Sequence, residues 1–251
     1  VGVANMISNT LVIGGNASSI HAAGRLARQK VEDARDKIAK LVGARASEVV
    51  FTSGGTEANN LVLRGIKCKH IMASTVEHDS VLDAAENIEC LAVDENGIID
   101  MEAFERRLDK TEGQVLVSIM LANNETGVIQ PVAEVSKIAK KYGALVHTDA
   151  VQACGKIKLD KEELGVDFIS LSAHKIGGPQ GIGALIASEE VQLNSLMRGG
   201  GQERGRRAGT ENLSGIAGFG VAVEFAKSRS HVAETRKLRD ALESSLKKIV
   251  P

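Results

Sequence analysis

The sequence has few aromatic residues and few cysteines, and both shortages exclude classes of protein. Aromatic residues make up 2% of its 251 residues, with no Trp and one Tyr. Platforms that stack unpaired nucleic-acid bases are therefore not expected. The three cysteines, Cys68, Cys90 and Cys154, are odd in number and form no C-x-x-C pair, so the sequence predicts neither a disulfide framework nor a zinc site. Free thiols suit a reducing compartment, and we expect a cytoplasmic location.

Long apolar runs and an excess of basic charge are also missing. The sequence contains no run of about 18 apolar residues, the length that a membrane-spanning helix needs, and no basic amphipathic segment that would favour a membrane surface. Its net charge of −1 carries no electrostatic signature of nucleic-acid binding. We therefore expect small molecules or other proteins as partners.

Apolar residues recur instead in short, alternating strand and helix patterns. A strand over residues 48–52 leads through a glycine turn into a helix over residues 57–64, which follows an earlier amphipathic helix over 21–42. Further strands are predicted near 70–74, 89–93, 114–121 and 144–148, and further helices near 80–87, 101–108, 131–141 and 232–250. This alternation predicts an α/β domain with a mainly parallel sheet covered by helices.

Polar or ionisable groups follow five of the predicted strands. In parallel sheets, ligands bind beyond the carboxyl ends of the strands, so these groups should share one site. The SGGT turn at 53–56 lacks the GK[ST] ending of a nucleotide-binding P-loop, although it could hold another phosphate at a helix N-terminus. The five groups are Ser53 to Thr56, Glu77 with His78, Asn123 with Asn124, Asp149 to Gln152, and Ser172 to Lys175.

Each of these groups also has an ordinary structural explanation. Lys175 lies beside glycines between two short predicted strands and could be a solvated loop lysine, and His78 could be a surface histidine. Asp149 could cap a helix, and the adjacent asparagines could form a turn. His147 and Asp149 form an H-x-D pair, but no further ligand cluster supports a metal site.

Together, the five strand ends supply the parts of a pyridoxal-phosphate site. Such a site needs a phosphate cradle, an acid at the pyridine nitrogen, a donor at the phenolic oxygen, a ring to stack and a lysine for the aldehyde. A strand-end carboxylate in a partly dry cleft can keep a ring nitrogen protonated, because a nearby opposite charge favours the charged form. We therefore predict pyridoxal 5'-phosphate as the cofactor.

Motifs along the chain resemble those of the cysteine desulfurases, class V of the aminotransferase-fold enzymes. In order they are FTSGGTEANN, an EH pair, NNETGVIQP, HTDAVQACGK, SAHKIGGPQGIGAL and RGGGQERGRRAGTEN, between about residues 16 and 212. The resemblance implies a fold type I enzyme that removes sulfur from L-cysteine, giving L-alanine and an enzyme persulfide for iron–sulfur clusters or other sulfur transfer. A selenocysteine lyase or another class V lyase or aminotransferase would share these motifs. A non-catalytic scaffold for sulfur-transfer partners is the alternative from a different class.

The resemblance also implies a role for individual residues. Lys175 would bind the cofactor aldehyde and shuttle the substrate α-proton, and His78 would stack on the ring and act in proton transfer. Thr210 matches a residue that reaches the phosphate of the neighbouring subunit, which implies a homodimer. The remaining cofactor contacts would come from Gly55, Thr56, Ser172 and His174 at the phosphate, Asp149 at the pyridine nitrogen, and Asn124 and Gln152 at the phenolic oxygen.

The chain departs from the family pattern at both ends. It opens without an initiator Met, and the family's nucleophilic cysteine and substrate-binding arginine would lie beyond Pro251. We expect residues 1–231 to form a cofactor-binding large domain with a truncated start, and residues 232–251 to begin a small domain. These residues would then bind the cofactor, while the nucleophile that passes sulfur to an acceptor protein, such as an iron–sulfur scaffold, would lie outside them.

Overall fold

The computed structural model describes residues 1–13, 15–228 and 230–249, and it is built around one seven-stranded sheet. The strand order is β1-β7-β6-β5-β4-β2-β3, and β7 is antiparallel to both of its neighbours while the other pairs are parallel. The predicted mainly parallel α/β fold is confirmed. The strands are β1 (Val49–Thr52), β2 (His70–Ser74), β3 (Ile88–Leu91), β4 (Val115–Ser118), β5 (Leu145–Asp149), β6 (Phe168–Ser172) and β7 (Gly183–Ala187).

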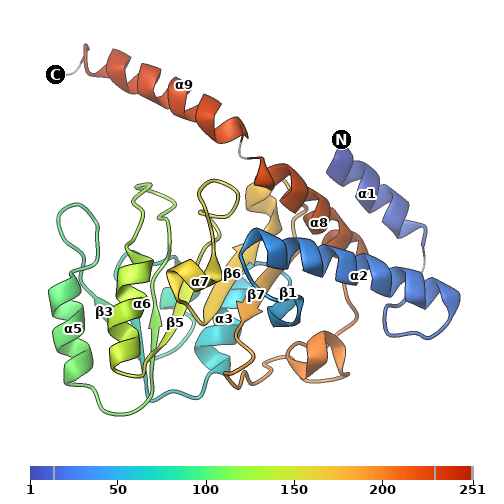
Figure 1. Cartoon of the computed structure of the whole chain (residues 1–251), viewed down its shortest axis with the longest axis horizontal. Helices are drawn as coiled ribbons and strands as arrows, with labels where there is room; N and C mark the ends of the chain where they lie inside the picture. The colour runs from blue at the N-terminus through green and yellow to red at the C-terminus, as the bar shows by residue number, and fades with distance from the viewer. Residues whose placement is uncertain (14, 229, 250–251) are drawn as a thin grey trace.

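Helices cover both faces of this sheet (Figure 1). One apolar cluster joins the sheet to α2, α5, α6 and α8, and a second joins the opposite face to α3 and α4. All residues of β4, β6 and β7 are buried, as expected for strands with helices on both faces. The helices are α1 (Gly2–Leu11), α2 (Ala22–Leu41), α3 (Gly55–Gly65), α4 (Asp79–Leu82), α5 (Met101–Asp109), α6 (Val132–Lys141), α7 (Lys161–Leu164), α8 (Leu213–Lys227) and α9 (Ser230–Leu246).

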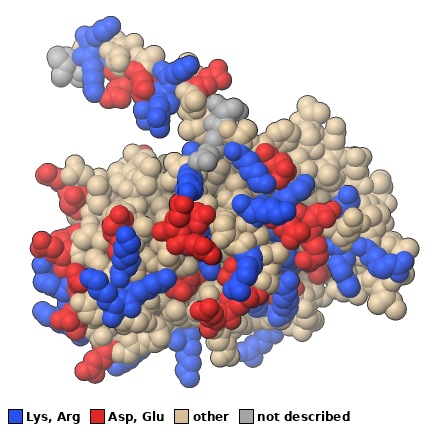
Figure 2. Space-filling model, in the orientation of Figure 1, with Lys and Arg blue, Asp and Glu red and all other residues tan. Residues whose placement is uncertain are grey.

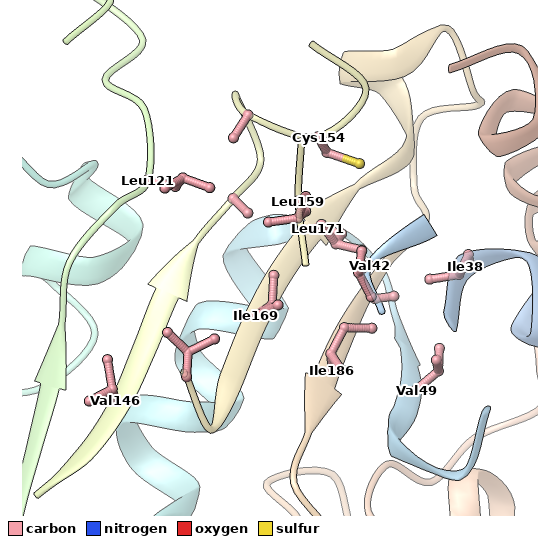
Figure 3. Close-up of a cluster of buried hydrophobic side chains, with 14 of the residues drawn as sticks. Ile38, Val42, Val49, Leu121, Val146, Cys154, Leu159, Ile169, Leu171 and Ile186 are labelled. Atoms are coloured by element: carbon pink, nitrogen blue, oxygen red, sulfur yellow. The ribbon is translucent and has the colours of Figure 1, made fainter. Parts of the chain in front are cut away.

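Helix α2 shows how the apolar pattern builds the larger cluster. Its buried residues Ala27, Val31, Ala34 and Ile38 recur at helical spacing and face the sheet and α8. Figure 3 shows Ile38 among the aliphatic side chains of β1, β6 and β7. Full burial of one such side chain contributes about 1.5–3 kcal/mol. At the crossing with α8, a Cβ on Gly220 would lie 2.9 Å from the Ala34 Cβ, so the close approach requires glycine.

Some elements differ from the sequence-based expectation. Helix α4 ends at Leu82, whereas the pattern predicted a helix to residue 87; only a short segment connects it to β3. Regular pairing in β4 ends at Ser118, although the apolar run continues to residue 121. Helices α1 and α8 were not predicted, and α8 lies against both α1 and α2. A helix that is covered on more than one side needs no polar face. The helical period of its apolar residues is therefore hard to recognise in the sequence.

Helix α9 extends away from the rest of the molecule (Figure 1). Leu238, Leu242 and Leu246 recur every four residues along it and are 68%, 60% and 52% exposed. Across the face shown in Figure 2, basic and acidic side chains are interspersed rather than gathered into a field of one sign. Within the described residues, no helix has both the length and the apolar character needed to cross a membrane.

Candidate active site

A cavity of about 200 Å³ lies beyond the carboxyl ends of β1, β2, β4, β5 and β6. The side chains come from loops far apart in sequence, and the parallel strands bring them to one edge of the sheet. Of the ten residues predicted for the site, nine line this cavity: Gly55, Thr56, His78, Asn124, Asp149, Gln152, Ser172, His174 and Lys175. Ser80, Met120 and Val151 complete its wall.

One end of the cavity is formed by the N-terminus of α3. Helix α3 begins at Gly55, and its N-cap Gly54 makes no side-chain cap bond. A Cβ on Gly55 would lie 2.8 Å from Val151 Cγ2, so glycine keeps this corner open. Ser172 Oγ lies 2.9 Å from His174 Nδ1 in the same wall. First-turn N–H groups, a helix dipole and hydroxyls suit a phosphate.

Asp149 supplies a buried carboxylate to the same cavity. It is 6% exposed, and burial raises its pKa. Two hydrogen bonds act in the opposite direction: Asn59 Nδ2 donates to Oδ2 at 2.7 Å, and the Val151 N–H donates to Oδ1 at 2.9 Å. A carboxylate in such a dry position favours a cationic partner, as a protonated pyridine nitrogen would provide.

His78 is held at the start of α4, where it is the N-cap residue. Its Nδ1 accepts a hydrogen bond from the Ser80 backbone N–H at 3.0 Å and lies 2.9 Å from Ser80 Oγ. Asn59 Nδ2 in turn donates to Ser80 Oγ at 2.9 Å. The ring is exposed toward the cavity that it lines, so it is available to stack on a flat ligand.

Lys175 lies in a 3-10 turn, Ala173–Ile176, between β6 and β7. Gly177 ends the turn in the left-handed region at φ 79°, which glycine adopts without strain. Within the described part of the chain, Lys175 Nζ has no hydrogen-bond or ion-pair partner. The residue also borders a second hollow of about 310 Å³, together with Cys154 and Lys156. Its amine is therefore free to react with a ligand in the cavity.

Gln152 is oriented by a neighbouring lysine. Lys156 Nζ donates to the Gln152 carbonyl and to Gln152 Oε1, both at 2.9 Å. Because Oε1 is used in this way, the amide NH₂ remains as the donor for a ligand oxygen. Burial and the charge of Lys175 lower the pKa of Lys156. Asn124 lines the cavity as well, so two amide side chains border it.

Thr210 does not reach this cavity. It is exposed and borders a separate hollow with Ser53 and Arg207. Its loop is tied to the phosphate end, because Arg207 Nε donates to Glu57 Oε1 at 2.8 Å and the Ser53 N–H donates to Glu57 Oε2 at 2.7 Å. The loop is thus fixed beside α3 while Thr210 remains at the surface.

Sequence reasoning missed two polar residues that connect the site. Asn59 and Ser80 link Asp149 to His78, but neither follows a strand, so the strand-end rule did not select them. The asparagine pair that follows the SGGT turn in FTSGGTEANN was the available signal. Glu77, which was noted at a strand end, is buried, and burial raises its pKa to about 8.

The H-x-D pair does not form a metal-binding cluster. His147 lies within 2.8 Å of Ser118 Oγ and 2.9 Å of Ser170 Oγ, inside the sheet, and burial lowers its pKa to about 3. Asp149 bonds Asn59 instead. Among the described residues, no group of three or more His, Cys, Asp or Glu side chains could hold a metal ion.

Comparisons with known proteins agree with this arrangement. The sequence model of the family "Aminotransferase class-V" matches residues 5–250. A cysteine desulfurase IscS from Dictyoglomus turgidum is 46% identical over 241 residues, covering 90% of this chain and 61% of that protein. A cysteine desulfurase from Sinorhizobium fredii is 44% identical, covering 94% and 65%.

Solved structures show the same relationship. The NifS-like protein from Rickettsia africae superposes with a TM-score of 0.91 at 40% identity, covering 98% of this chain and 71% of that chain. The chain spans about three fifths of the length of the curated relatives it matches. The chain therefore belongs to the class-V aminotransferase family, and these relatives within it carry the name cysteine desulfurase.

Proposed function

We propose that these residues bind pyridoxal 5'-phosphate through Lys175 and serve a cysteine desulfurase, which converts L-cysteine into L-alanine and a protein persulfide. The observation that carries the proposal is the single cavity lined by nine residues that the sequence had already singled out. It unites an anion-binding helix N-terminus, a buried carboxylate, an imidazole, amide groups and an amine without a partner among the described residues.

The residues present fit this cofactor. Thr56, Ser172 and His174 would hold its phosphate at the N-terminus of α3, and charge-assisted hydrogen bonds of this kind contribute about 1.5–3 kcal/mol each. Asp149 would keep its ring nitrogen protonated, and Gln152 would donate to its phenolic oxygen. When bound, pyridoxal phosphate supplies an electron sink for the substrate α-carbon.

Lys175 would have two tasks in the reaction. Its Nζ would hold the cofactor aldehyde, and as a free amine it would hold the substrate α-proton. Lys175 borders the cavity without another partner among the described residues, so its position suits both tasks. Positioned proton transfer is typically worth about 10²–10⁴ in rate.

Similar proteins support cysteine as the substrate. Relatives at 40–46% identity carry the name cysteine desulfurase. A structure titled "SspA in complex with cysteine" superposes with a TM-score of 0.81 at 33% identity and covers 89% of this chain. The sulfur would pass to an acceptor protein such as an iron–sulfur scaffold, and the unpaired thiols of the described chain fit a cytoplasmic setting.

The proposed assembly is a homodimer in which Thr210 serves the partner's cofactor. The surface position of Thr210, outside its own chain's cavity, supports this role. We also propose that residues 1–231 form the cofactor-binding domain and that 232–251 begin a second domain, since α9 leaves the body with an exposed apolar stripe.

Borohydride trapping tests the cofactor assignment. Addition of pyridoxal phosphate should give a visible absorbance band, and reduction should leave a stable adduct that peptide mass spectrometry locates on Lys175. Lys175→Ala should lose both, whereas Lys158→Ala, an exposed lysine paired with Glu163, should keep both. A trapped adduct in Lys175→Ala would refute the lysine assignment. Turnover of L-cysteine against L-selenocysteine by an intact protein that also carries the nucleophile then identifies the substrate.

A further inference from the structure

The Nδ1 atom of His78 has a defined role in hydrogen bonding. The Ser80 backbone N–H donates to it at 3.0 Å, and a backbone N–H can only donate. Nδ1 must therefore present its lone pair. Ser80 Oγ lies 2.9 Å from the same nitrogen, so the hydroxyl hydrogen is a second donor at Nδ1.

Asn59 determines the direction of that hydroxyl. Its Nδ2 donates to Asp149 Oδ2 at 2.7 Å and to Ser80 Oγ at 2.9 Å. An ionised carboxylate can only accept, which places the amide nitrogen, rather than the oxygen, on this side. Since Ser80 Oγ accepts from Asn59, its own hydrogen is directed to His78. Asn59 is 0% exposed, so its amide is shielded from water. We call these two residues the Asn59–Ser80 bridge.

The bridge leaves the single proton of a neutral imidazole on Nε2. This nitrogen lies on the other edge of the ring and has no hydrogen-bond partner within the described ranges, while the residue itself lines the cavity. From these contacts we propose that His78 presents Nε2–H to the cofactor as a hydrogen-bond donor, so that the α-proton assigned to Lys175 in the proposed function finds no second acceptor at this residue. The proposal rests on the proposed function and divides the acid–base tasks of that site between the two residues.

The carboxylate of Asp149 acts against the hydrogen-bond pattern at His78 Nδ1. Its negative charge attracts a charged imidazole, and this attraction contributes least to the pKa of Asp149, after burial and the hydrogen bonds from Asn59 and Val151. A second proton on His78 would have to enter at Nδ1, where two donors already lie at hydrogen-bond distance. The direct contacts therefore keep the Nδ1 lone pair directed at the two donors of Ser80.

This arrangement removes His78 as a base. Its basic lone pair is directed at Ser80 and away from the substrate, so it cannot take the α-proton without first breaking both contacts. In the proposed step the C–H bond breaks, the proton bonds to the lone pair of Lys175 Nζ, and the electron pair remains with the substrate carbon. A neutral imidazole that stabilises developing charge through its N–H is an established catalytic device.

The tautomer can be observed without cofactor by ¹⁵N NMR of histidine-labelled protein. For His78, identified from the spectrum of His78→Gln, we expect a protonated Nε2 and an unprotonated Nδ1. Ser80→Ala removes one of the two donors and should reduce the ratio of the two neutral tautomers about fivefold, the value of one ordinary hydrogen bond. Ser80→Thr, which restores a hydroxyl, should return the ratio to its original value.

Ser214→Ala is the matched control, because Ser214 is the second residue of α8 just as Ser80 is the second residue of α4, and its hydroxyl also bonds the N-cap side chain. It should leave the His78 signals unchanged. A protonated Nδ1 in the unsubstituted protein, or identical His78 spectra in Ser80→Ala and the unsubstituted protein, would overturn the proposal whether or not the cofactor binds.

A second test measures exchange of the L-alanine α-proton in D₂O by the cofactor-loaded protein. His78→Gln offers an N–H near the position of Nε2 but no base, whereas His78→Leu offers neither. Loss of an oriented donor typically costs about 10²–10³ in rate, so we expect His78→Leu to fall on the order of 10² and His78→Gln by less than tenfold. Equal losses in the two variants would contradict the donor role.

The two tests also separate this inference from the proposed function. Absence of the visible cofactor band in the unsubstituted protein would refute cofactor binding, while the NMR result would still report on the tautomer. A normal band and full exchange in Lys175→Ala would refute the assignment of the base. A normal visible band in the unsubstituted protein, together with a protonated Nε2, supports both.

Discussion

At the scale of single residues, burial decides which cysteine is reactive. Cys154 is 1% exposed, and burial raises its pKa to about 12, whereas Cys90 is exposed. Figure 3 places Cys154 at the top of the aliphatic cluster. At pH 8 only about one in 10⁴ of such thiols is ionised. We therefore expect iodoacetamide to modify Cys90 in the folded protein and Cys154 only in urea, as read by peptide mass spectrometry. Equal rates at the two thiols would show that Cys154 is accessible.

Lys156 illustrates how a residue outside the predicted set can orient one inside it. Its two hydrogen bonds to Gln152 leave the amide NH₂ free for a ligand oxygen. Lys156→Met should allow the amide to rotate and raise the dissociation constant of pyridoxal phosphate about tenfold, the effect of one charge-assisted hydrogen bond. Absorbance titration measures this constant. Lys158→Met, two positions along the same loop and exposed, should match the unsubstituted protein; an equal loss there would indicate a general charge effect.

At the scale of elements, Glu77 connects the ends of β2 and β4. Its Oε1 accepts from Ser74 Oγ at 2.5 Å and from the Met120 N–H at 2.8 Å. Burial raises its pKa to about 8, from 4.5. The folded protein therefore binds more protons than the unfolded chain between these values. This contribution to stability is complete below about pH 4.5 and is lost as the pH rises toward 8, by at most about 1.4 kcal/mol per pH unit.

Glu77→Gln should remove this pH dependence. We expect urea unfolding to show that the variant gains stability relative to the unsubstituted protein when the pH is raised from 5 to 8. Glu125→Gln changes an exposed carboxyl and should leave the pH profile unaltered. Parallel profiles for Glu77→Gln and the unsubstituted protein would mean that Glu77 ionises normally in the folded state.

The loop between β7 and α8 is held by a buried ion pair with α2. Arg35 Nη1 and Nη2 donate to the two carboxylate oxygens of Glu203 at 2.8 Å each, and the Phe51 N–H also donates to Glu203. Arg35→Met would leave the carboxylate buried without its cation, and we expect a loss of about 3–5 kcal/mol in the free energy of unfolding. Arg106→Met, which breaks an exposed pair, should cost less than about 1 kcal/mol. Equal losses of unfolding free energy in the two variants would show that the buried pair contributes no more to stability than the exposed pair.

At the scale of the whole molecule, most residues of the candidate site can be predicted from where the strands of the sheet end. The rule for parallel sheets places Thr56, Asp149 and Lys175 at one edge from the sequence alone, because it depends only on chain order and strand direction. It could not identify Asn59 or Ser80, since their function depends on how the side chains of α3 and α4 meet. Helix α8 was missed for a different reason: neighbours on more than one side remove the amphipathic pattern that marks a surface helix.

The proposed dimer predicts that two inactive variants can complement each other in a mixed dimer. If Thr210 binds the phosphate in its partner's cavity, Thr210→Val and Lys175→Ala damage the same site from different subunits. Each variant alone should lack tight, lysine-linked cofactor. After unfolding and refolding together, a mixed dimer contains one cavity with both Lys175 and the partner's Thr210, so about a quarter of all cavities should regain tight binding. Borohydride trapping at limiting cofactor concentration measures the fraction of cavities that regain tight binding. No recovery in mixed dimers would mean that Thr210 does not serve the partner's cavity, since each cavity would then depend on its own chain alone.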